Sequence, residues 1–207
     1  MHLGHYEMVC AVFERQLLDR VIIVPVYQNP LKAHAPTLPE ALRWRMLEET
    51  FAEFDQVTIS AFEIRKKELS YTYRTLEHFR IKYPYARLSL LMGEDALRLF
   101  HKWVHPEKIL SLAGILAFSR PAPHCSSGGS DTLSGYATKA RKIDWAIPPI
   151  SATEIRAATI EQIKRKPMLH PAAMAIWESH LAKSRYPKKV GADDVAVPCH
   201  TKFKNSD

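Results

Sequence analysis

Short, continuously apolar segments alternate along the chain with longer segments in which apolar residues recur every three or four positions. The segment Val21–Val26 is rich in β-branched residues, which is typical of a parallel strand covered on both faces. Leu88–Met92 and Ile115–Phe118 are also apolar and predict strands. We predict two further short strands over Val57–Phe62 and Asp144–Ile147.

The segments between these strands have the spacing of helices. One helix opens near Pro39, since proline favours a first helical turn, and carries apolar residues at helical spacing: Leu42, Met46, Leu47 and Phe51. The other predicted helices are Gly4–Leu18, Ser70–Lys82, Glu94–Phe100, Pro106–Leu110, Ala152–Arg165 and Pro171–Leu181. Pro121–Gly135 is rich in Pro, Ser and Gly and predicts a mobile loop, and the polar chain from Lys183 onward predicts a weakly ordered tail.

Strand and helix therefore alternate, which predicts a doubly wound α/β fold with a parallel sheet and right-handed crossovers. The chain has 207 residues and no internal repeat, so we predict a single domain over residues 1–186 and a polar tail over residues 187–207. Ligands of such folds bind outside the carboxyl ends of the strands. Residues that follow strand ends, and helices that begin there, are therefore the first candidates for a site.

Composition and charge narrow the class of protein. Hydrophobic residues make up 46% and charged residues 25%, which excludes a mainly disordered or collagen-like chain. No apolar run approaches the roughly 18 residues of a membrane span, and the N-terminus lacks a secretory pattern. Few, widely spaced cysteines (Cys10, Cys125 and Cys199) indicate reduced thiols and a cytoplasmic location. The net charge of +7 suits a polyanion but does not choose among nucleic acid, a membrane surface and a nucleotide.

The first candidate motif is His2-Leu3-Gly4-His5 at the start of the first helix. Histidines three apart share one face of a helix start, and the free N–H groups there attract phosphate. Gly4 lets a ligand approach the backbone closely. The alternative is a chain terminus with two incidental histidines.

The second motif is Ser151-Ala152-Thr153-Glu154-Ile155-Arg156. Ser151 and Glu154 have the spacing of a capping box, and a well-capped helix is the structural alternative to a site. Thr153 and Arg156 are also three apart, so a hydroxyl and a guanidinium share a face. Together with the helix N-terminus they would hold a triphosphate.

The third motif, Gly93-Glu94-Asp95, follows the strand Leu88–Met92. A glycine at a strand end followed by a carboxylate can bind a nucleoside, with the backbone on the base and the carboxylate on a hydroxyl. The alternative is a tight turn with acidic residues in the first helical turn, which is favourable in itself.

Taken in order, these motifs resemble the bacterial nicotinate-nucleotide adenylyltransferases of the HxGH nucleotidyltransferase superfamily. His2–His5 resembles the superfamily signature, and Ser151–Arg156 resembles its ISSTxIR element. Further segments that resemble the family are Asn29–Lys32, Glu63 with Ser70–Leu76, Leu91–Leu97, His101–Trp103 and Ile109-Leu110. Two residues within them depart from the pattern: Leu31 stands in a histidine position, and Arg74 stands where many members carry Asp. The resemblance covers about residues 2–186 and implies a Rossmann-like nucleotidyltransferase domain.

The resemblance implies adenylyl transfer from ATP to nicotinate mononucleotide, giving nicotinate adenine dinucleotide and pyrophosphate. By resemblance, the residues on the ATP side are His2, His5, Gly93, Asp95, Ser151, Thr153 and Arg156, with His2, His5 and Arg156 catalytic. Those on the acceptor side are Lys32, Thr72 and Trp103, whose indole would stack on the pyridine ring. Mg²⁺ would be carried mainly by the ATP phosphates, with no metal site in the protein. These substrates account for the basic charge without nucleic acid or membrane, and a homo-oligomer stays open.

One departure from the family pattern concerns the start of the chain. Family members carry a strand and then G-[ST]-F-[DN]-P before HxGH, whereas Met1 directly precedes His2 here. That strand would lie in the middle of a parallel sheet, and its loss would expose backbone groups of its neighbours. We expect a true start upstream of Met1. The alternatives are an inactive remnant that binds nucleotides, or a related adenylyltransferase that uses nicotinamide mononucleotide or phosphopantetheine. The strands are apolar on both faces, which disfavours an RNA-binding domain.

Overall fold

The computed structural model describes residues 2–32, 38–118, 135–145, 147–148, 150, 154–155 and 158–183. The strands in chain order are β1 (Val21–Ile23), β2 (Val57–Ile59), β3 (Ser89–Gly93), β4 (Gly114–Phe118) and β5 (Ala140–Ile143). The α-helices are α1 (Leu3–Glu14), α2 (Glu40–Phe51), α3 (Phe62–Lys66), α4 (Thr72–Lys82), α5 (Glu94–Arg98), α6 (Pro106–Leu112), α8 (Ile160–Arg165) and α9 (Pro171–Lys183). Short 3₁₀ turns cover Pro30–Lys32, Phe100–Lys102 and Ala137–Lys139.

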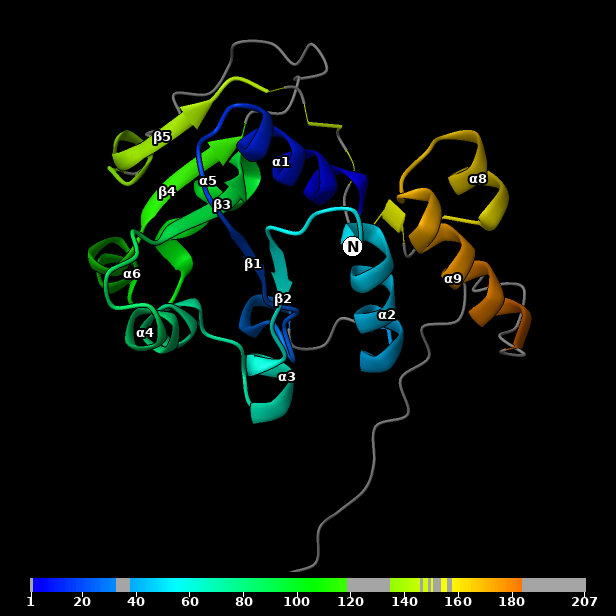
Figure 1. Ribbon diagram of the computed structural model, residues 1–207, viewed down its shortest axis with the longest axis horizontal. Coiled ribbons are helices and arrows are strands. Elements are labelled where there is room, and N and C mark those ends of the chain that lie inside the picture. Colours follow the sequence, from blue (N-terminus) through cyan, green and yellow to red (C-terminus); the bar gives the residue numbers. More distant parts are fainter. Residues whose placement is uncertain are drawn as a thin grey trace, which may run out of the picture.

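The strands form two parallel sheets, which confirms the predicted parallel α/β architecture (Figure 1). β1 pairs with β2, with Val21 opposite Val57. The second sheet has the order β3-β4-β5, with Gly93 opposite Phe118 and Phe118 opposite Ile143. Among the described residues no ladder joins β1 to β3. The two parts therefore leave one edge of β1 and one edge of β3 without a strand partner in the described chain.

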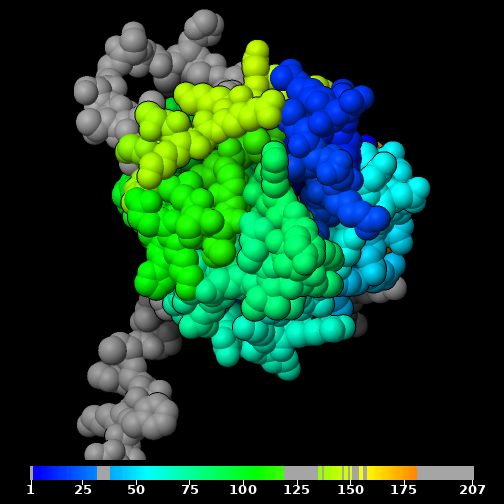
Figure 2. All heavy atoms as spheres, turned by 60° about the vertical axis from the view of Figure 1, so that its left-hand side comes forward, coloured from blue at the N-terminus to red at the C-terminus, as the bar shows by residue number. Residues whose placement is uncertain are grey.

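Helix α1 is the element that holds the two sheets on a common core. Val9 and Val12 of α1 pack in one apolar cluster with Val21 of β1 and Phe118 of β4. Because the helix contacts apolar residues on both sheets, it is apolar on most sides, as its sequence indicates. At its C-terminal end, the Arg15 guanidinium donates to the Asp144 carbonyl over 2.5 Å, which fastens α1 beside the chain that leaves β5 (Figure 2).

Helix α1 ends earlier than its apolar pattern predicts. The predicted end is Leu18, but Gln16 adopts a left-handed conformation with φ of 51°. The Leu17 N–H donates to the Val12 carbonyl and the Gln16 N–H to the Phe13 carbonyl, which together form a Schellman motif. The motif satisfies the last carbonyls of the helix and turns the chain toward β1.

Two further apolar clusters hold the remaining helices in place. The larger lies under α4, α5 and α6 and includes Leu76, Phe100, Ile109 and Ile115. The other joins α2 to α8 and α9 through Met46, Ile163 and Ala173, with Ile150 and Ile155 among its buried members. These clusters fix the positions of the helices whose first turns carry candidate site residues.

Besides the end of α1, two predicted strands and one predicted helix differ from the structure. The strand predicted over Asp144–Ile147 is wrong: β5 is Ala140–Ile143, an edge strand whose Arg141 and Lys142 are exposed, so its sequence lacks an apolar run. The strand predicted to reach Phe62 ends at Ile59, because Phe62 begins α3.

The single helix predicted over Ala152–Arg165 is also wrong as one element. Thr159 is extended and caps α8 through its side chain, which accepts from the Gln162 N–H over 3.2 Å. Gln162 returns the interaction by accepting from the Thr159 N–H. A capping box therefore begins a new helix at Ile160. The Pro121–Gly135 loop, apart from its last residue, and the tail after Lys183 lie outside the described residues.

Candidate active site

The N-terminus of α1 packs against the chain that follows β5. Ile147, which follows β5, is so close that a Cβ added at Gly4 would lie 3.0 Å from its Cγ2 atom. The same Cβ would lie 3.1 Å from Nδ1 of His2. The small size of Gly4 is therefore required by the packing of the protein itself, whereas the motif alone indicates room for a ligand.

His2 and His5 lie together at this helix start, as their spacing predicts. Their ring centroids are 3.8 Å apart with a tilt of 36°. His2 is only 7% exposed, whereas His5 is exposed. The His2 backbone N–H donates to Nδ1 of His5 over 3.5 Å, which favours the tautomer with the proton on Nε2. An Nε2–H of an imidazole can donate to an anion.

Gly93 and Asp95 lie where the third motif places them. Gly93 is the last residue of β3 and directly precedes α5, and a Cβ there would meet no described heavy atom within 4 Å. Asp95 is exposed in the first turn of α5. Because β3, β4 and β5 are parallel, Gly93 lies at the same end of the sheet as Ile143, the last residue of β5. The chain that follows β5 runs along α1, from Asp144, which accepts from Arg15 at the end of the helix, to Ile147, which lies beside Gly4 at its start.

On the acceptor side, the structure brings the segments of Thr72 and Trp103 together. Thr72 is the first residue of α4 and is half-buried. Its neighbour Tyr73 packs edge-on against His105, with ring centroids 4.9 Å apart. Trp103 follows the 3₁₀ turn and packs on Phe100, at 5.4 Å between centroids. The indole is half-buried, so it contributes to the core and keeps part of its surface accessible.

Lys32 ends the 3₁₀ turn Pro30–Lys32, and its side chain lies outside the described residues. Asn29 directly precedes this turn, and its side-chain oxygen accepts from the Leu31 N–H over 2.9 Å. This side-chain turn is typical of Asn before a reversal.

Ser151, Thr153 and Arg156 lie outside the described residues. The residues beside them are described: Ile150 and Ile155 are buried in the cluster that contains Met46. Glu154 pairs with Lys166 over 2.9 Å. Ile150 and Ile155 therefore anchor the chain next to α2 on either side of Thr153, while the roles predicted for Ser151, Thr153 and Arg156 stay predictions.

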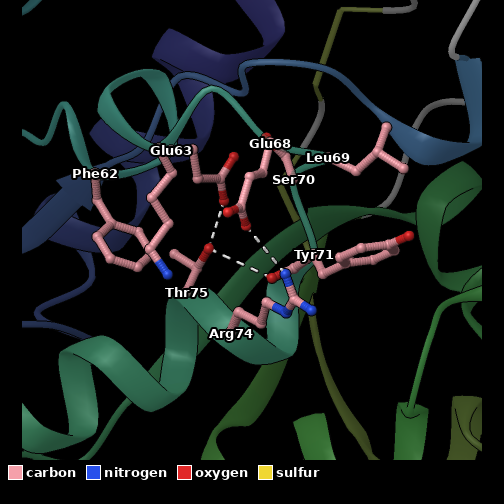
Figure 3. Close-up of a pocket in the computed structure, with 9 residues that line it drawn as sticks. Phe62, Glu63, Glu68, Leu69, Ser70, Tyr71, Arg74 and Thr75 are labelled. Carbon is pink, nitrogen blue, oxygen red and sulfur yellow. Dashed lines mark hydrogen bonds and ion pairs between the residues drawn. The ribbon is translucent and has the colours of Figure 1, made fainter.

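A small pocket behind the first turn of α4 contains a hydrogen bond that the motifs do not indicate (Figure 3). The hydroxyl of Thr75 donates to Oε1 of Glu63 over 2.5 Å, and both residues are buried. Arg74, at the rim, pairs with Glu68 over 3.2 Å and donates to the Tyr73 hydroxyl over 3.0 Å. The hydrogen bond to Tyr73 raises the pKa of the Arg74 guanidinium.

Within the described residues, no group of three or more His, Cys, Asp or Glu side chains could hold a metal ion. None of the helices described there is long and apolar enough to cross a membrane.

Comparison with known proteins identifies the family. A family model described as cytidylyltransferase-like matches residues 1–174. A Clostridium botulinum (strain Loch Maree) protein named probable nicotinate-nucleotide adenylyltransferase is 31% identical over 160 residues, which are 75% of this chain and 80% of that protein. The chain belongs to the nicotinate-nucleotide adenylyltransferase family. An Aquifex aeolicus protein of the same name is 39% identical to this family member over 121 residues, which are 58% of this chain and 71% of that protein.

Solved structures confirm the nucleotidyltransferase fold of this adenylyltransferase family member. The Plasmodium falciparum nicotinic acid mononucleotide adenylyltransferase complexed with APC has a TM-score of 0.65 at 14% identity, covering 88% of this chain and 92% of the other. The same enzyme complexed with NaAD has a TM-score of 0.65 at 17% identity, covering 87% and 90%. At these identities the likeness establishes the fold, as the resemblance of the motifs implies.

Proposed function

We propose that this chain transfers the adenylyl group of ATP to nicotinate mononucleotide, releasing pyrophosphate and forming nicotinate adenine dinucleotide. The observation that supports this most directly is the pair of adjacent imidazoles, His2 and His5, at the N-terminus of α1. Gly93 at the end of β3 and Asp95 in the first turn of α5 have the positions expected of the third motif. The names and the ligands of the related proteins favour the same reaction.

In this reaction an oxygen of the mononucleotide phosphate attacks the α-phosphorus of ATP, and the bond from the α-phosphorus to the bridging oxygen breaks. The phosphate is already an anionic nucleophile, so the chain needs no general base and forms no covalent intermediate. Catalysis consists of positioning and of stabilising charge on the phosphates. His5 would donate from Nε2 to a phosphate oxygen, while the helix N-terminus beside His2 supplies further N–H donors.

The remaining residues have the following proposed roles. Thr153 and Arg156 would hold the β- and γ-phosphates that leave, and Ser151 would cap their helix. Gly93 and Asp95 would contact adenosine. Mg²⁺ would enter bound to the ATP phosphates.

The acceptor would bind between the first turn of α4 and Trp103. Thr72 and the free N–H groups of this turn would bind the carboxylate of the nicotinate ring, and the accessible part of the indole would stack on that ring. Lys32 would contact the phosphate of the mononucleotide. The contact between Tyr73 and His105 supports this arrangement, because it joins the two segments directly.

Pyrophosphate release from ATP and Mg²⁺ tests the proposal. Nicotinate mononucleotide, nicotinamide mononucleotide and phosphopantetheine are offered separately to the full chain, with a reaction lacking acceptor as control. We expect release with nicotinate mononucleotide well above that with the other two. A preference for another acceptor would reassign the substrate. Release with none of them would contradict the enzyme and favour the inactive remnant.

A further inference from the structure

The segment between β1 and the Asn29–Lys32 turn is held by a side chain from α2. Nη1 of Arg43 donates to the Val26 carbonyl over 2.6 Å, and Nε donates to the Leu38 carbonyl over 3.2 Å. Val26 and Leu38 stand on either side of residues 27–37, the connection that carries Lys32. One guanidinium therefore bonds both ends of this connection. Burial lowers the pKa of Arg43, the direction expected for a guanidinium withdrawn from water.

The opposite side of the same segment is held by Ser70. The Ser70 N–H donates to the Gln28 carbonyl over 2.9 Å, and the Ser70 hydroxyl oxygen accepts from the Tyr27 N–H over 2.9 Å. Gln28 also forms a parallel bridge with Leu69. Ser70 is buried, so these bonds are shielded from competing water.

Ser70 lies close along the chain to Thr72, which is proposed to contact the acceptor, so the hydrogen bonds of Ser70 affect the acceptor site. Thr72, the first residue of α4, is two residues further along, and Lys32 is four residues beyond Gln28. Any change in the Ser70 contacts therefore shifts the α4 first turn relative to the Asn29–Lys32 turn. These are the two segments that carry the acceptor contacts proposed for Thr72 and Lys32.

We propose that Arg43 and Ser70 are positioning residues for the acceptor, and that together they set the spacing between the Asn29–Lys32 turn and the N-terminus of α4. This inference rests on the proposed function for its substrate. Neither residue is assigned a substrate contact, so each acts through the backbone it holds.

The kinetic test compares Ser70→Ala and Arg43→Met with Thr50→Val. Thr50→Val is a matched control. The buried Thr50 hydroxyl donates to the Met46 carbonyl within α2, so this variant loses a hydrogen bond that does not involve residues 26–28. We expect KM for nicotinate mononucleotide to rise about five- to tenfold in the first two variants, the effect of a hydrogen bond or two. KM for ATP should change less than about twofold in all three, and Ser70→Thr should restore part of the loss by returning a hydroxyl oxygen.

Equal increases in both KM values, or the same increase in Thr50→Val, would overturn the positioning role and leave a general loss of structure. The thermal midpoint of each variant shows whether it is folded. If either Ser70→Ala or Arg43→Met does not fold, the KM values of the other variant decide the test.

Hydrogen exchange provides a readout that does not depend on activity. Backbone amides over residues 24–32 should exchange faster in Ser70→Ala and Arg43→Met than in the unsubstituted chain, and at the unsubstituted rate in Thr50→Val. Unchanged exchange would overturn the inference even in an active enzyme. Faster exchange in a chain that releases no pyrophosphate would instead contradict the proposed function and retain the structural link between Ser70 and the segment.

Discussion

The carboxylate of Glu63 accepts a hydrogen bond of 2.5 Å from the hydroxyl of Thr75, and this bond ties α3 to the beginning of α4 (Figure 3). Both residues are buried, and Oε2 of Glu63 has no hydrogen-bond partner in the described part of the chain. A buried carboxylate depends on its few donors, because water does not replace a lost one. The Thr75 hydroxyl is thus the principal partner of this carboxylate.

Thr75→Val removes that donor while keeping the shape of the side chain. We expect a loss of about 2–3 kcal/mol in the free energy of unfolding, since a buried charged acceptor is left without its partner. Thr75→Ser keeps the hydroxyl and should lose distinctly less. Urea unfolding measures both, and equal losses in the two variants would show that the methyl group, rather than the hydrogen bond, matters.

Trp103→Ala should weaken the acceptor complex. If the accessible part of the indole stacks on the pyridine ring, KM for nicotinate mononucleotide rises about tenfold and KM for ATP stays nearly constant. Trp103→Phe keeps a ring in the same place and serves as the control. An unaffected KM in a folded Ala variant would limit Trp103 to its packing on Phe100.

Arg156→Ala should lower kcat about 100-fold or more, because the guanidinium would stabilise charge on the departing pyrophosphate. Arg165→Ala is a matched control, since Arg165 is an exposed residue in the last turn of α8. Steady-state pyrophosphate release compares the two. Turnover of the Arg156 variant equal to that of the Arg165 variant would remove Arg156 from the site.

The stability of the fold should depend on pH through His78. Its ring stacks on Phe62 at 4.0 Å, and burial, together with Lys82 and Lys66, lowers its pKa. The unfolded chain takes up the proton near pH 6.5 while the folded chain resists it, so stability present above that pH is lost as the pH falls below it through the lowered pKa of the folded state. His78→Phe keeps the stack without a titrating group and should flatten this part of the profile. An unchanged slope of unfolding midpoint against pH would exclude His78 as its source.

The described strands form two separate sheets, so a strand added between them should change the stability of the fold. β1 is paired with β2 and β3 with β4 in the described chain, so a parallel strand between β1 and β3 would find partners on both sides. A chain extended before Met1 by about five β-branched residues and a G-S-F-D-P turn, the pattern that the family carries, should unfold at a higher temperature than the chain of 207 residues.

Hydrogen exchange locates the effect of this extension. Amides of β1 and β3 should become protected, whereas those of β5, at the far side of the second sheet, should not change. An unchanged thermal midpoint together with unchanged exchange in β1 and β3 would show that the added strand does not enter the sheet.

The sequence alone determined the parts of the fold that depend on local pattern. Apolar segments placed β1, β3 and β4, and helical spacing placed α2, α4, α6 and α9 within a few residues, with proline as the first residue of α6 and α9. Motif spacing also placed His2 beside His5 and Gly93 at a strand end, because neighbours along a helix or strand have fixed geometry.

Tertiary structure alone decided what depends on distant partners. The edge strand β5 has charged residues at Arg141 and Lys142, and only its pairing with β4 makes it a strand. Glu63 and Ser70 belong to a motif that indicates no contact for them, and nothing in the sequence pattern marks Arg43. Apart from the bond of Arg43 to Leu38, the hydrogen bonds named for these residues join segments 12 to 43 residues apart. Such bonds form only after the apolar clusters have placed α2, α3 and α4 around the end of β1, because residue spacing fixes geometry within an element and not between elements.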